Sequence, residues 1–67
     1  MPSFASCNDA VSTYNSAIEE VSNRLRRYSR CVSDSQGSDD CDPEFRRLRS
    51  AHGDFESAVS SYRSDCD

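Results

Sequence analysis

The stretch CVSDSQGSDDCDPEF, Cys31–Phe45, lies near the middle of this 67-residue chain and decides how the chain folds. Its two cysteines bracket nine small or polar residues, with Gly37 among them, which is the composition of a loop. Asp42 and Pro43 then place a capping acid before a proline, a pattern that opens helices. The stretch therefore predicts a short connection between two regular segments.

Apolar residues on both sides of this stretch recur in alternating steps of four and three. Before it, the series runs through Cys7, Val11, Tyr14, Ile18, Val21, Leu25, Tyr28 and Val32. After it, the series runs through Cys41, Phe45, Leu48, His52, Phe55, Val59, Tyr62 and Cys66. Such a/d spacing is typical of helices that pack along one narrow seam.

The two seams match in eight layers when the chain folds back on itself, from Cys7 opposite Cys66 to Val32 opposite Cys41. We therefore predict an all-α fold, an antiparallel two-helix hairpin that is coiled-coil-like and stapled by two disulfides. It forms a single domain over residues 1–67, with a helix over about 6–32 capped by Ser6, a loop over about 33–41 and a helix over about 42–66. The seams could instead belong to two helices of a larger bundle.

Four cysteines allow three pairings, and helix geometry selects one of them. Cys7 and Cys31 lie about 36 Å apart along one helix, whereas bridged Cα atoms lie within roughly 7 Å. The same distance separates Cys41 from Cys66, and the remaining crossed pairing needs parallel helices that a short loop cannot connect. We predict the bridges Cys7–Cys66 and Cys31–Cys41. The alternatives are free thiols or zinc held across a dimer, because the hairpin puts two cysteines at each end and no C-x-x-C spacing occurs. We expect no metal and no cofactor.

The composition excludes several classes of function. Twelve acidic residues against eight arginines give a net charge of -4, which disfavours nucleic acid and anionic membranes as partners. No apolar run approaches the length of a transmembrane helix or a signal-peptide core. Because disulfides form in oxidising compartments, we expect a secreted or periplasmic protein whose leader is absent from this sequence.

Four alanines lie beside the seam on one side of the predicted hairpin and form a candidate partner face. They are Ala10, Ala17, Ala51 and Ala58. Small side chains there would let a partner helix, or a second copy of the chain, approach closely. Alternatively, they serve close approach between the two helices of the hairpin itself.

Seven of the eight arginines lie in the half of the hairpin near the loop, where five acidic residues leave a net charge of +2. The candidate anion patch consists of Arg24, Arg27, Arg46 and Arg47. Arginine suits bidentate binding of phosphate or carboxylate groups. The alternative is a solvated face of salt bridges.

His52 is the one histidine and occupies a seam position opposite Val21. If buried, it would make a pH-sensitive core; otherwise it leans out of the seam into water. No Ser, Cys or acidic residue stands at a spacing that suggests catalysis, so we expect no enzyme.

These features favour a small exported helical hairpin that acts as a protein-binding module, such as an inhibitor, a toxin or effector, or an assembly subunit. One alternative is a self-associating structural protein, a homodimer that forms a four-helix bundle. A second alternative is a polyanion binder that uses the arginine-rich loop end.

Overall fold

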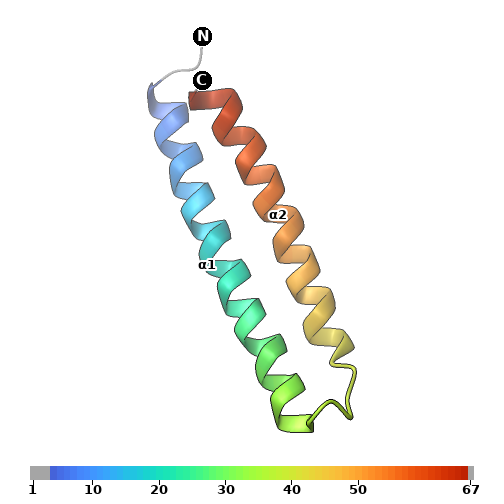
Figure 1. The fold of residues 1–67 in the computed structure, drawn as a ribbon. Helices are drawn as coiled ribbons and strands as arrows, with labels where there is room; N and C mark the ends of the chain where they lie inside the picture. Colours follow the sequence, from blue (N-terminus) through green and yellow to red (C-terminus); the bar gives the residue numbers. More distant parts are fainter. Residues whose placement is uncertain (1–3, 67) are drawn as a thin grey trace.

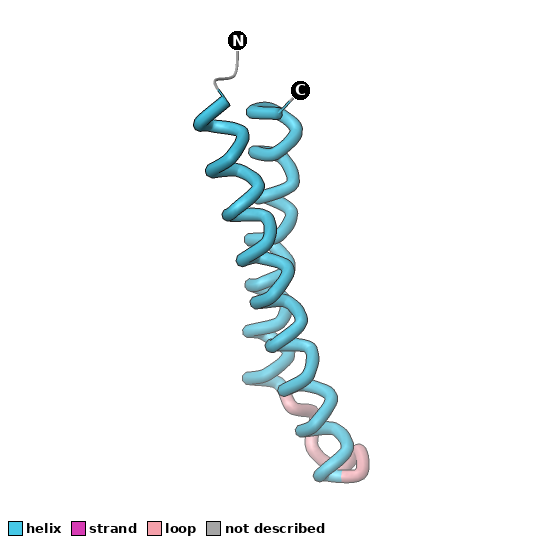
Figure 2. The backbone as a smooth tube through the Cα atoms, turned by 90° about the vertical axis from the view of Figure 1, so that its left-hand side faces the viewer, coloured by secondary structure: helices cyan, strands magenta, loops and turns pink. Residues whose placement is uncertain are grey.

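The chain forms two long antiparallel helices joined by one short connection (Figure 1). The computed structural model describes residues 4–66, in which α1 spans Phe4–Ser35, α2 spans Asp42–Cys66, and no strand occurs. Both views show the helices side by side along their length (Figures 1 and 2), and the Cα trace measures 52 × 13 × 13 Å. The predicted all-α hairpin is confirmed. Because α1 begins at Phe4, the predicted cap Ser6 lies inside the helix.

Helix α1 continues one turn beyond its predicted end at residue 32. Gln36 and Gly37 both adopt left-handed backbone, with φ of 55° and 81°. Their N–H groups donate to the carbonyls of Ser33 and Val32, at 3.2 and 3.1 Å. This pair of bonds is a Schellman motif, which satisfies carbonyls that the end of a helix leaves unpaired. Residues 33–35 have loop composition, yet helix α1 ends only after them.

Helix α2 is capped by aspartates that precede it. Asp42, the predicted cap, is the first helical residue, and the carbonyl of Cys41 accepts the Phe45 N–H at 2.9 Å. The Asp39 carboxylate accepts the Cys41 N–H at 2.9 Å, and the Asp40 carboxylate accepts the Asp42 N–H at 3.1 Å. These bonds hold Cys41 in a left-handed conformation, with φ of 54°. The turn thereby aims the Cys41 side chain at α1.

Both predicted disulfides are present. Cys7–Cys66 joins the open end of the hairpin with a Cα–Cα distance of 4.8 Å, and Cys31–Cys41 joins the loop end with a distance of 6.0 Å. Bridged Cα atoms usually lie about 4.4–6.8 Å apart, so each disulfide holds the two helices side by side at its end of the hairpin. The two bridges therefore keep α1 and α2 together at both ends.

The contact between the helices is centred on alanines. The buried residues of the hairpin are Ala10, Ala17, Cys41, Ala51 and Ala58, each exposed by 9% or less. The predicted seam instead placed in this contact the larger residues that directly follow the alanines, namely Val11, Ile18, His52 and Val59. The real contact is rotated toward the alanines by about 50°, half the step between successive residues of a helix.

The rotation leaves large apolar side chains partly exposed. Val11, Ile18, Leu25, Val32, Phe45 and Tyr62 are each 37–52% exposed. Aromatic rings bridge the helices beside the alanine contact, with centroid distances of 5.6 Å for Tyr14–Phe55 and 5.7 Å for Tyr28–Phe45. The predicted register is thus kept, while the predicted seam is only half enclosed.

Candidate protein-binding face

One long side of the hairpin carries most of its large apolar side chains, and we refer to it as the apolar face. It consists of Val11, Ile18, Leu25 and Val32 from α1, Phe45, Val59 and Tyr62 from α2, and the rings of Tyr14, Tyr28 and Phe55 between them. These residues come from both helices and run from one bridge to the other. The apolar face therefore extends along most of the molecule.

Helix geometry explains why both helices contribute to the same side. Ile18 follows the buried Ala17, and Val59 follows the buried Ala58, so each is turned by about 100° from the contact. Because the helices are antiparallel, the two rotations bring both side chains to one side of the hairpin. A shallow depression of about 440 Å³ there is lined by residues of both helices, among them Val11, Tyr14, Val59 and Tyr62.

The opposite side, next to the alanines, is polar. A second shallow depression there is lined by Glu20, Arg24, Arg47, Ser50, Ala51 and Asp54. The Arg24 guanidinium donates to the Glu20 carboxylate at 2.7 Å. A partner docking on this side would have to cover charged groups rather than apolar ones.

The prediction that Ala10, Ala17, Ala51 and Ala58 form a partner face is wrong. Their side chains are already used in the contact between α1 and α2, where they are 3–9% exposed. The alternative, close approach of the two helices, accounts for them. The surface that remains open is the other side of the hairpin.

The residues of the predicted anion patch do not converge. Arg24 and Arg47 line one depression, which they share with the carboxylates of Glu20 and Asp54. Arg27 lines a separate depression with Asn23, Arg26 and Arg30. Arg46 forms an exposed ion pair with Asp42 at 3.1 Å. Nearby carboxylates thus offset part of the positive charge at the loop end.

His52 does not belong to a buried core, which corrects the idea of a pH-sensitive one. Its side chain is 60% exposed, its Nδ1 lies 3.5 Å from the Glu56 carboxylate, and its ring lies 6.4 Å from that of Phe55. Since His52 follows the buried Ala51, it shares the line of Phe45 and Val59 on the apolar face.

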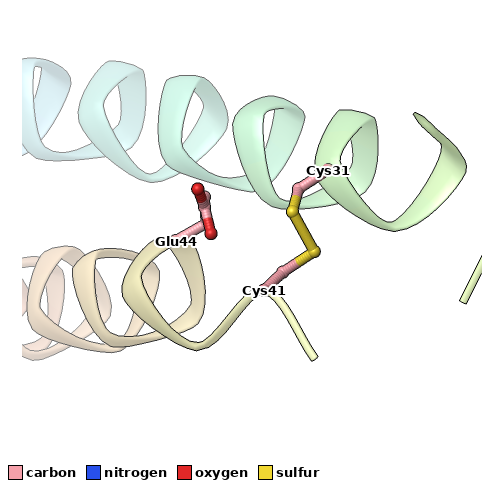
Figure 3. A group of neighbouring side chains, drawn as sticks. All are labelled: Cys31, Cys41 and Glu44. Atoms are coloured by element: carbon pink, nitrogen blue, oxygen red, sulfur yellow. A yellow bond between two sulfur atoms is a disulfide. The ribbon is translucent and has the colours of Figure 1, made fainter. Parts of the chain in front are cut away.

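One cluster combines residue types that can ligate metals. The sulfur atoms of Cys31 and Cys41 and a carboxylate oxygen of Glu44 lie within 4.8 Å of one another (Figure 3). Metals bind the thiolate form of cysteine, and here the two sulfurs are bonded to each other. In this oxidised form the cluster is a structural bridge with a neighbouring carboxylate.

Comparisons with protein-family models, curated proteins and solved structures each give no match for this chain. Over the part of the chain that the structure describes, neither helix is long and apolar enough to cross a membrane. The apolar face and the two bridges are therefore the features from which a function can be inferred.

Proposed function

We propose that this chain is a small exported protein-binding module that acts without catalysis and docks through its apolar face. The observation that carries the proposal is the row of large apolar side chains, each 37–52% exposed, along one side of the hairpin. Monomeric soluble proteins rarely expose contiguous apolar patches beyond a few hundred Å² unless a partner covers them. Burial of such a surface stabilises a complex by about 25 cal/mol per Å² of apolar area.

Two further features support this function. Bridges at both ends hold the helices in one arrangement before binding, so less conformational entropy is lost when a partner docks. They also suggest an oxidising compartment, which is the basis for proposing export. The exposed His52 gives no support for catalysis, because the partners that the structure shows for it are the carboxylate of Glu56 and the ring of Phe55.

A polyanion-binding function has weaker support. The four arginines proposed for it are divided among separate surfaces, and Arg24 and Arg46 each already contact a carboxylate. An anion would have to compete with these carboxylates.

The test compares two variants of α1 that add the same charge on opposite sides. Ile18→Glu alters the apolar face, whereas Ser16→Glu lies about 200° away around the helix and is the matched control. The oxidised proteins are cross-linked in the native extracellular fluid, and the captured proteins are identified by mass spectrometry. We expect Ile18→Glu to lose a partner that Ser16→Glu retains. Equal capture by both variants would refute docking through this face.

A further inference from the structure

The two outer lines of the apolar face are symmetric about the middle of the hairpin. On α1 its outer residues are Val11, Ile18, Leu25 and Val32, which are evenly spaced about a midpoint between residues 21 and 22. On α2 the outer line is Phe45, His52 and Val59, with His52 in the middle. A feature of this kind is expected where a surface binds a copy of itself.

The two midpoints lie at the same height. The pairs Cys7–Cys66, Cys31–Cys41 and Tyr28–Phe45 join the helices, and the two residue numbers of each pair add up to 72 or 73. By the same rule, residues 21 and 22 lie level with His52. A two-fold axis that crosses the face at this height therefore maps the outer line of each helix onto itself.

From this symmetry we propose that the occupant of the apolar face is a second copy of this chain, packed antiparallel to form a four-helix bundle. The inference rests on the proposed function and names its partner. The two-fold axis lies between the copies and runs across the helices, so each helix meets its own counterpart. Ile18 then opposes Leu25 of the second copy, Val11 opposes Val32, Phe45 opposes Val59, and the two His52 residues meet at the axis.

The distribution of charge selects the antiparallel orientation. The half of the hairpin near the loop carries seven arginines and five acidic residues, for a net charge of +2. The open half carries one arginine and seven acidic residues, for a net charge of -6. A parallel dimer would place the two strongly negative ends together, whereas the antiparallel dimer places each beside a positive end.

The size of the whole side of the hairpin that carries the apolar face suits a stable dimer. The hairpin is 52 Å long. With a width of roughly 15 Å for two adjacent helices, the contact covers about 800 Å² per copy, which is the size of a standard protein interface. Across the axis, the large Phe45 opposes the smaller Val59.

His52 lies at the centre of this contact and has a role in it. A polar residue in an otherwise apolar helical interface favours one register over others, because a shift leaves it opposite apolar groups. At the two-fold axis, each His52 meets another His52 and has Glu56 of its own helix at 3.5 Å. Any shift along the helices would place it against Phe45 or Val59 instead.

The experiment measures the mass of the oxidised protein in solution by sedimentation equilibrium over a range of concentrations. We expect a dimer that Ile18→Glu weakens by about a hundred-fold, because a carboxylate would be buried without a partner in both copies. Ser16→Glu should leave the dimer unchanged. A monomer at all concentrations would overturn the inference. The proposed function survives that outcome if Ile18→Glu loses capture of a different protein that Ser16→Glu retains.

The orientation is tested with His52→Cys, whose native bridges are verified by peptide mapping without reduction. In the antiparallel dimer the two introduced thiols lie at the axis, and mild oxidation should join the two copies through a disulfide between them. Ser50→Cys, which lies on the alanine side, is the control and should give no covalent dimer. A dimer in which His52→Cys links no better than Ser50→Cys would overturn the antiparallel arrangement.

Discussion

Replacement of Ala58 by leucine tests whether the two helices meet at their alanines. Ala58 is 3% exposed, so a leucine there has no open space to enter. The helices cannot simply move apart, because disulfides fix both ends. Overpacking of a tight contact costs about 1–3 kcal/mol. At roughly 4–8 °C per kcal/mol for a domain of this size, the unfolding midpoint should fall by about 4–24 °C.

The measurement is thermal unfolding of the oxidised protein, followed by far-UV circular dichroism. Ser60→Leu is the matched control, since it introduces the same residue two positions later on the exposed outer side of α2. Leucine is a better helix former than serine, so the control should unfold at the wild-type midpoint or slightly above it. Both substitutions avoid the apolar face, which separates this test from dimerisation. Equal midpoints for Ala58→Leu and Ser60→Leu would refute the close contact.

Three further predictions concern the stability of the hairpin, measured by urea unfolding of oxidised proteins. Gly53→Ala should stabilise the hairpin by about 1 kcal/mol, because an added Cβ meets nothing within 4 Å and alanine favours the helix. Gly37→Ala should destabilise it, because Gly37 has a φ of 81°. Equal effects of the two substitutions would contradict this prediction. Replacement of both Cys7 and Cys66 by serine should lower the free energy of unfolding by about 4 kcal/mol, and replacement of both Cys31 and Cys41 by about 3 kcal/mol. The first bridge closes the longer loop and so removes more entropy from the unfolded chain. The reverse order would argue against this entropic explanation. Asp39→Ala and Asp40→Ala should each cost about 1 kcal/mol through lost caps, while the exposed Asp34 tolerates the same change; no difference from Asp34→Ala would exclude capping.

The fold could be predicted because two independent patterns specify it. The spacing of apolar residues requires helices, and the positions of the cysteines leave one pairing that fits helices of this length. The ends of the helices were less predictable. At α1, the sequence SDS has loop composition, yet Gly37 permits the Schellman motif that ends the helix three residues later than expected. At α2, the cap comes from Asp39 and Asp40, because Cys41 must turn toward its bridge.

The burial of the alanines could not be predicted because the sequence pattern fits two adjacent seams. Tyr14 and Phe55 belong to both seams. Residues such as Ile18 and Val59 complete one of them, and residues such as Ala17 and Ala58 complete the other. Hydrophobicity favours the larger residues, which is why the alanines were assigned to the surface. On each helix the alanines lie seven residues apart, and small side chains repeated on one side of a helix permit close approach of a neighbouring helix.

The distance between the helices decides which residues face water. A hairpin of two helices cannot surround a row of large side chains, because each helix has only one neighbour. The disulfides hold the Cα atoms of the bridged pairs 4.8 and 6.0 Å apart, and the contact through alanines between the bridges turns the larger residues of both helices to the same side. In this chain the small residues form the contact between the two helices, and the large ones remain partly exposed.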